Sequence, residues 1–88
     1  MNTLTKQAGR FTETVIDDEI VVMRLENGEF FSLSGTAAAT WRLIDGTRDR
    51  TSLIAALATE FDVHKTTVAA DVDDFLAQLR ENGLLAGL

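Results

Sequence analysis

The hydrophobic pattern of this 88-residue sequence changes its period once, at Ser34, and that change limits the folds open to the chain. Before Ser34, short runs rich in β-branched and aromatic residues are typical of strands. After it, apolar residues recur every three or four positions, which indicates helices. Strands followed by helices predict an α+β fold, a three-stranded antiparallel sheet followed by three helices, each covering the other's apolar faces. The short connections are compatible with a winged helix-turn-helix-like arrangement, with the hairpin as the wing.

Three strands are expected before Ser34. A polar turn at Asp17–Glu19 joins the first two. Asn27-Gly28 joins the second and third, and this dipeptide is typical of type I′ hairpin turns because both central residues need positive φ. The resulting meander leaves the third strand at an edge of the sheet. The expected strands are Arg10–Ile16, Ile20–Leu25 and Phe30–Leu33.

The first two expected helices have clear start and stop signals. Ser34 can cap a helix over Gly35–Asp45 by accepting an amide hydrogen bond, and Gly46 is well placed as its left-handed stop. After a short polar link, Thr51 or Ser52 can cap the second helix.

The third expected helix is the longest and continues to about Asn82, where Gly83 ends it. At the other end of the chain, residues 1–9 are polar and lack a period, so we expect a flexible tail before a single domain at 10–88. The last five residues are expected to pack back as a short tail. The third helix has an apolar stripe made of Val68, Val72, Phe75, Leu76 and Leu79.

Composition excludes several classes of function. There is no cysteine, so the chain has no disulfide or thiolate site, which fits a reducing cytoplasm. One histidine, His64, rules out a histidine-based metal site within one chain, and we expect it in a solvated loop. The sequence contains no run of 18 apolar residues, so it predicts no membrane span. The net charge of −6 is spread evenly without a basic stripe, which argues against nucleic acid as a partner.

The residues give little support for a catalytic function. Asp73 and Asp74 are adjacent on a helix, so their side chains point about 100° apart and cannot act together on one substrate atom. They are interpreted as a solvated helix face. Ser52 follows Arg50-Thr51 rather than the aspartate that an acyl carrier would need before its serine. We therefore expect a protein that is not an enzyme and needs no cofactor or metal.

The third strand carries the more informative pattern. Because strand side chains alternate, Phe31 and Leu33 share one face and are expected in the core, while Phe30 and Ser32 share the other. Natural edge strands are usually blunted by Lys or Pro, and this one has neither. The edge is then either a docking site for an extended peptide, or it is covered by the last helix.

Three segments, read in order, resemble the PqqD-like family, the precursor recognition elements of ribosomally synthesised and modified peptides. They are "GEFFSLSGTAAATWRLIDG", "LIAALATEFDV" and "VAADVDDFLAQLRENGLL". The family pattern begins with a Gly-x-Phe/Tyr-Phe/Tyr-x-Leu strand and a small-residue helix with Trp before Leu-Ile-Asp-Gly. A helix with an aromatic-Asp end follows, and a helix containing Phe-Leu-x-x-Leu closes the pattern. The resemblance covers residues 10–85, and it rests on the order and spacing of the segments more than on any one of them.

The resemblance implies a domain that binds the leader of a precursor peptide as an added strand against its third strand, beside the third helix. It also implies delivery to a separate modifying enzyme, as in the discrete leader-binding subunits of lasso-peptide pathways, whose leader protease is another chain. The free-standing subunit of pyrroloquinoline quinone synthesis is the alternative. The matching peptide-binding positions are Glu29, Phe30, Phe31, Ser32 and Leu33 on the strand, and Val68, Asp71, Val72, Asp74, Phe75 and Leu76 on the helix.

Two other functions stay open at this point. A winged-helix DNA-binding regulator would place the third helix on DNA, but the acidic residues on that helix, such as Asp71 and Asp74, would repel phosphate and attract a basic peptide. A structural subunit could use the apolar edge to dimerise. We expect a cytoplasmic monomer or weak dimer whose main partner is a leader peptide.

Overall fold

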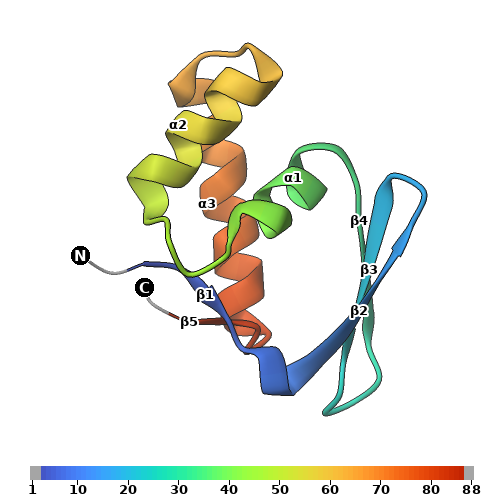
Figure 1. The fold of residues 1–88 in the computed structure, drawn as a ribbon. Coiled ribbons are helices and arrows are strands. Elements are labelled where there is room, and N and C mark those ends of the chain that lie inside the picture. Colours follow the sequence, from blue (N-terminus) through green and yellow to red (C-terminus); the bar gives the residue numbers. More distant parts are fainter. Residues whose placement is uncertain (1–2, 87–88) are drawn as a thin grey trace.

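The computed structural model describes residues 3–86 and has an α+β architecture. Figure 1 shows a three-stranded sheet on one side and the helices on the other, with α1 lying between the sheet and the other two helices. The first and last described segments pair with each other in a second, two-stranded sheet. The elements are β1 (Thr5–Lys6), the 3-10 turn η1 (Ala8–Arg10), β2 (Phe11–Ile16), β3 (Glu19–Arg24), β4 (Phe30–Leu33), α1 (Gly35–Leu43), α2 (Arg50–Phe61), α3 (Lys65–Glu81) and β5 (Leu85–Ala86).

The main sheet is an antiparallel meander in the order β2-β3-β4, as the sequence predicts. In its register, Thr12 pairs with Met23 on one side of β3, and Phe30 pairs with Met23 on the other. The first turn is shorter than expected, because Glu19 already belongs to β3 and Asp17 takes the left-handed conformation with a φ of 55°. β4 is an edge strand, which confirms that part of the prediction.

The connection between β3 and β4 differs from the expected type I′ turn. Of its two signature residues only Gly28 has a positive φ, at 71°. The loop spans residues 25–29, and its backbone closes through the Gly28 N–H, which donates to the Arg24 carbonyl at 2.9 Å. Asn27 instead accepts a hydrogen bond from the Glu29 N–H at 3.0 Å. This side-chain turn, which Asn readily forms, replaces the left-handed backbone that the type I′ turn requires.

The helices lie where the period predicts them, but their ends differ. Ser34 holds the N-cap position of α1 without a capping side-chain hydrogen bond, and α1 ends at Leu43, two residues early. For α2, neither Thr51 nor Ser52 is the cap. Asp49 is, because its carboxylate accepts from the Ser52 N–H at 2.9 Å. The expected kind of capping hydrogen bond is thus made, but Asp49 provides the accepting side chain and Ser52 donates only its backbone N–H.

The N-terminal segment is not the flexible tail expected for residues 1–9. Leu4 is 1% exposed and belongs to the core, and its N–H donates to the Arg48 carbonyl at 2.8 Å. β1 pairs antiparallel with β5, so residues 4–6 are held by the chain's other end. Met1 and Asn2 lie outside the described residues. At the C-terminus, residues 84–86 do pack back as expected, and residues 87–88 lie outside the described part.

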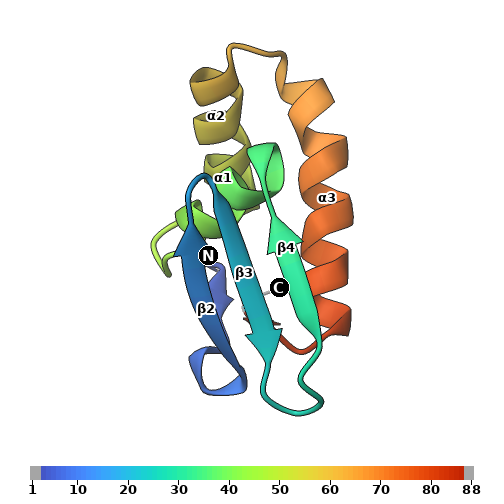
Figure 2. The same cartoon turned by 90° about the vertical axis from the view of Figure 1, so that its right-hand side faces the viewer.

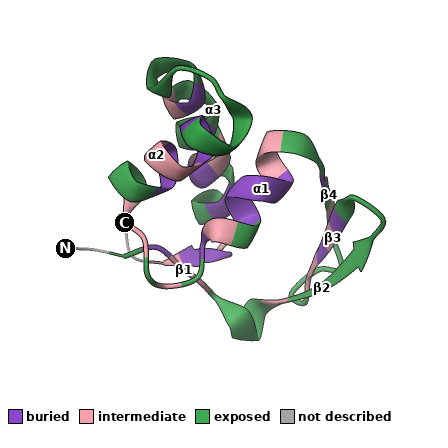
Figure 3. Ribbon diagram, turned by 45° about the horizontal axis from the view of Figure 1, so that its top comes forward, coloured by how far each residue is buried: buried purple, intermediate pink, exposed green. Residues whose placement is uncertain are grey.

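The described residues share one hydrophobic core between the sheet and the helices, and Figure 3 shows buried positions on both, including much of α1. Trp41 of α1 is almost fully buried, with Phe11 edge-on at a ring-centroid distance of 5.1 Å. The indole N–H of Trp41 donates to Glu13, and the Lys6 ammonium lies 4.4 Å from the ring centroid. Lys6 has a pKa below its ordinary value, mainly because burial disfavours its charge.

Candidate functional site

The outer edge of β4 carries backbone groups that the sheet does not use. The Arg24 N–H donates to the Glu29 carbonyl at 2.9 Å, and antiparallel ladders alternate bonded and non-bonded pairs. Phe31 and Leu33 therefore direct their amides toward β3, while Phe30 and Ser32 direct theirs outward. Within residues 3–86, no backbone hydrogen bond reaches these outward groups. The edge can therefore accept another extended strand.

Figure 2 shows α3 beside β4. Residues of both elements line one groove. It encloses about 310 Å³ of empty space, counting its open side. The walls are mostly apolar, with one side from the sheet and the other from the C-terminal half of α3. We call this the β4–α3 groove, and it is lined by Val22, Phe31, Leu33, Phe75, Gln78, Leu79, Asn82 and Leu84.

The β4 residues of the predicted site divide between two faces. Phe31 is half-buried against the core and lines the groove. Leu33, the last residue of β4, also lines the groove and is buried. Phe30 lies on the opposite face and is 68% exposed. Ser32 shares that face, and its hydroxyl donates to Glu19 at 3.2 Å. Glu29 precedes the strand and is exposed, 3.4 Å from the Arg24 guanidinium.

The α3 residues of the predicted site divide in the same way. Val68, Val72 and Leu76 are 3, 0 and 3% exposed and pack in the core, which leaves almost no surface for a peptide to contact. Phe75 lines the groove and is half-buried. The expected role of the three aliphatic residues as groove walls is therefore replaced by a role in the core. Val72 and Leu76 are turned about 60° and 100° from Phe75 on the helix. Val68 has nearly the same direction as Phe75 but lies two turns closer to the start of α3, away from the groove.

Asp71 and Asp74 are exposed on α3 and do not line the groove, and helical spacing places them toward its rim. Asp71 lies four residues before Phe75, and Asp74 four before Gln78, so each carboxylate is one helical turn above a residue that lines the groove. The adjacent Asp73 faces elsewhere. Both of its oxygens bind the Arg50 guanidinium, at 2.6 and 2.8 Å, and this pair lowers the pKa of Asp73.

Several lining residues were not identified from the sequence. Gln78 and Asn82 follow Phe75 by three and seven positions, so helical spacing alone would place them on the same face. Val22 could also have been identified, because it pairs with Phe31 across β3 and β4 and so lies on the same inward face of the sheet. Leu84 could not, because its position depends on how the chain turns after α3.

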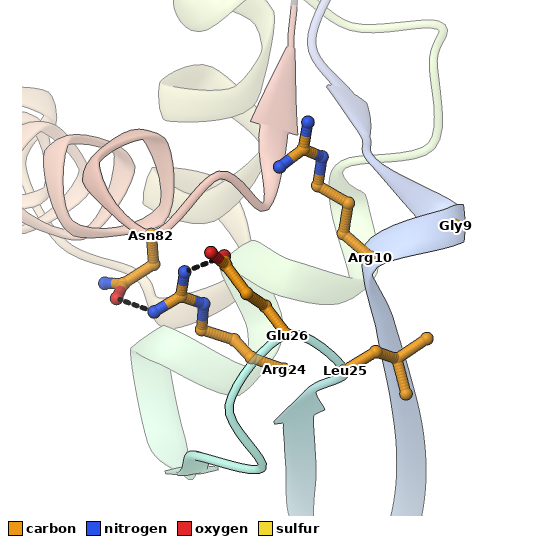
Figure 4. A pocket seen from close by; sticks show the side chains of 6 residues that line it. All are labelled: Gly9, Arg10, Arg24, Leu25, Glu26 and Asn82. Carbon is orange, nitrogen blue, oxygen red and sulfur yellow. Dashed lines mark hydrogen bonds and ion pairs between the residues drawn. The ribbon is translucent and has the colours of Figure 1, made fainter.

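A second cavity adjoins the lower end of the groove, where β4 begins. It holds about 430 Å³ of space, including open solvent. Figure 4 shows Arg24 reaching across it to Asn82 and Glu26, with contacts of 3.4 and 2.9 Å. Asn82 lines both cavities, so the two lie next to each other at the end of α3. We call it the arginine pocket, and it is lined by Gly9, Arg10, Arg24, Leu25, Glu26 and Asn82.

Other chemistry has little support within residues 3–86. This part of the chain contains no group of three or more residues able to hold a metal ion, and none of its helices is long and apolar enough to cross a membrane. His64 is exposed just before α3, as expected, with Nδ1 2.7 Å from the Thr66 hydroxyl. The groove combines an open strand edge with apolar walls and a charged rim, which suits an extended peptide.

Comparison with known proteins agrees with this geometry. The family model of coenzyme PQQ synthesis protein D (PqqD) matches residues 19–85. The structure of TbiB1 in complex with the TbiA(beta) leader peptide is 30% identical, with a TM-score of 0.80, and the match covers 90% of this chain and 92% of that one. A lasso peptide synthetase B1 complexed with the leader peptide shares the fold, with 20% identity, a TM-score of 0.80, and coverage of 94% and 96%. No curated protein sequence matches.

Proposed function

The chain belongs to the family of coenzyme PQQ synthesis protein D (PqqD), and from this premise we propose that it binds the leader segment of a ribosomally synthesised precursor peptide. The single observation that carries the proposal is the open edge of β4 beside an apolar groove. TbiB1, the 30% identical relative, was solved with a leader peptide bound. The protein itself is proposed to be non-catalytic.

Binding by strand addition would use the outward amides of Phe30 and Ser32. Main-chain pairing gives affinity with little dependence on sequence, while side-chain pockets give selectivity. In an added strand, alternate side chains point toward the groove, where Phe31 and Phe75 offer apolar contact. We propose Phe30, Phe31, Ser32, Leu33 and Phe75 as the contact residues, flanked by Glu29, Asp71 and Asp74.

The electrostatic character of the chain supports a peptide partner over a nucleic acid. Asp71 and Asp74 on the groove rim favour a leader that carries Lys or Arg nearby, and they would repel phosphate. The net charge of −6 acts in the same direction. A winged-helix DNA-binding regulator is therefore the less favoured alternative. We still infer a winged helix-turn-helix-like arrangement of the fold, with the β3–β4 hairpin as the wing.

We propose that a separate enzyme receives the bound precursor in the cytoplasm, where ribosomal peptides are made. A leader protease of a lasso-peptide pathway is the favoured partner enzyme, because the sequence resembles the discrete leader-binding subunits of such pathways and the leader-bound relative TbiB1 matches 90% of this chain. A peptide chaperone of pyrroloquinoline quinone synthesis is the alternative, supported by the family model.

The decisive experiment is fluorescence anisotropy with a labelled peptide that has the leader sequence of the precursor encoded beside this gene. Saturable one-to-one binding is expected, and no binding at tens of micromolar protein would overturn the proposal. A labelled DNA duplex is the control. Retention of DNA that falls steeply with salt would favour the regulator instead.

Light scattering with and without the leader addresses the structural alternative. A monomer or weak dimer that becomes a one-to-one complex is expected. A stable dimer whose mass is unchanged by saturating leader would favour a scaffold that uses the β4 edge for self-association.

A further inference from the structure

We propose that the arginine pocket binds an acidic side chain of the peptide that lies in the β4–α3 groove. This inference rests on the proposed function and adds to it a specificity determinant outside the predicted contact residues. The groove itself selects apolar side chains. The pocket would add one anionic position, at the end of the groove where β4 begins, and so help to set the register of the peptide.

The position of the pocket connects it to the peptide path. Asn82, at the end of α3, lines both the groove and the pocket. Arg24 is the last residue of β3 and lies opposite Glu29, immediately before the β4 edge begins. A strand added along β4 therefore passes the mouth of the pocket as it leaves or enters the groove. A glutamate or aspartate at that point is within side-chain reach of the guanidinium groups.

The charges in the pocket favour an anion. Arg10 contributes a guanidinium that has no ion-pair partner among residues 3–86. Arg24 is 17% exposed and is oriented by the Asn82 side-chain oxygen at 3.4 Å. Figure 4 shows both arginines on the walls of the same cavity. Arginine suits this role, because its planar group can donate two parallel hydrogen bonds to one carboxylate.

The present partner of Arg24 can be exchanged. Glu26 lies 2.9 Å from the guanidinium, but its side chain is 72% exposed on the β3–β4 loop. Glu29 is a second exposed partner, at 3.4 Å. Exposed ion pairs contribute little, because water solvates both charges well and the long side chains lose freedom when they pair. A carboxylate from a bound peptide can therefore replace Glu26 at Arg24 while Arg10 provides a second contact.

The first experiment tests the pocket without a leader peptide. Amide and side-chain NMR signals are followed during titration with N-acetyl-glutamate N-methylamide, and with the matching glutamine compound as the uncharged control. Selective shifts at Gly9, Leu25 and the Asn82 side chain are expected with glutamate only. They should weaken in Arg10→Gln, strengthen in Glu26→Gln and persist in Arg42→Gln, whose arginine is exposed on α1 outside the pocket. Equal shifts with both compounds would overturn the proposal.

The second experiment tests the pocket within the complex. Each acidic residue of the leader is changed to its amide, and affinity is measured with the wild-type protein and with Arg10→Gln. One position should cost about fivefold with the wild type and clearly less with the variant, in which only Arg24 remains to contact the carboxylate, as coupled charges require. If the leader binds but no position behaves in this way, the pocket has a purely structural role. If no leader binds at all, the proposed function fails, and the titration with glutamate still decides the pocket.

Discussion

Phe30 and Phe31 are consecutive in β4 but lie on opposite faces of the sheet. Phe30 is mostly exposed beside Met23, whereas Phe31 lies opposite Val22, packs against the core and lines the groove. Their backbone groups differ as well, because the amide of Phe30 points to the open edge and that of Phe31 toward β3. One aromatic therefore contributes to stability, and the other is free for contact.

This division predicts unequal effects of the two phenylalanines on stability. Phe31→Ala should lower the free energy of unfolding by about 2 kcal/mol, less than for a fully buried phenylalanine. Phe30→Ala, the matched control on the exposed face, should change it by less than about 0.5 kcal/mol. Urea unfolding can be followed by the fluorescence of Trp41, the single tryptophan. Equal losses in the two variants would contradict the assignment of faces.

The open edge makes a second prediction, on binding. Ser32→Pro removes an outward amide without breaking the ladder to β3, so leader affinity should fall about fivefold, as for one lost hydrogen bond. Val15→Pro is the matched control, because Val15 is exposed on β2 and its amide points away from β3 at the opposite edge. Ser32→Ala keeps the amide and should bind nearly as well as the wild type. If Ser32→Pro and Val15→Pro are folded and bind equally, the leader does not add to β4.

The three strands of the main sheet and the three helices could be predicted because each has a local signal. Alternation places Phe31 and Leu33 on one face whatever the rest of the chain does. The caps were harder, because Asp49, Thr51 and Ser52 are all good N-cap residues within one turn, and only the tertiary structure selects among them. The type I′ turn predicted after β3 was wrong for a related reason. The Asn27 side chain accepts a backbone hydrogen bond, so Asn27 does not need a left-handed conformation.

The candidate site was only partly predictable, because it depends on the direction of each side chain on its helix and on contacts between residues far apart in the sequence. Val68, Val72 and Leu76 belong to the same stripe as Phe75, but Leu76 is turned about 100° from its neighbour, and that rotation separates core from groove. The arginine pocket joins Arg24 to Asn82, 58 residues apart in the chain. No periodic pattern in a single sequence encodes such a contact.

A third prediction concerns the N-terminus, whose pairing partner is about 80 residues away. Leu4→Ala should lower the free energy of unfolding by about 3 kcal/mol, because the side chain is buried in the core. Leu25→Ala, at an exposed leucine, should have an effect of less than about 0.5 kcal/mol. Urea unfolding of both variants measures the difference. A Leu4 variant as stable as the wild type would mean that residues 4–6 are not part of the cooperative unit.

A fourth prediction concerns the loss of stability at low pH, through two carboxylates that bind groups at the start of α2. The pKa of Asp49 is lowered by its hydrogen bonds to Ser52, and that of Asp73 by Arg50. Because both folded pKa values lie below the ordinary 3.8, their stabilising effect is complete above that pH and is lost as the pH falls through the folded values. Urea midpoints measured from pH 6 to pH 2 should therefore fall most steeply below about pH 4. Asp49→Asn with Asp73→Asn should flatten this dependence, whereas Asp74→Asn, at an exposed rim aspartate, should leave it unchanged. An equally steep fall in the double variant would show that other carboxylates carry the acid sensitivity.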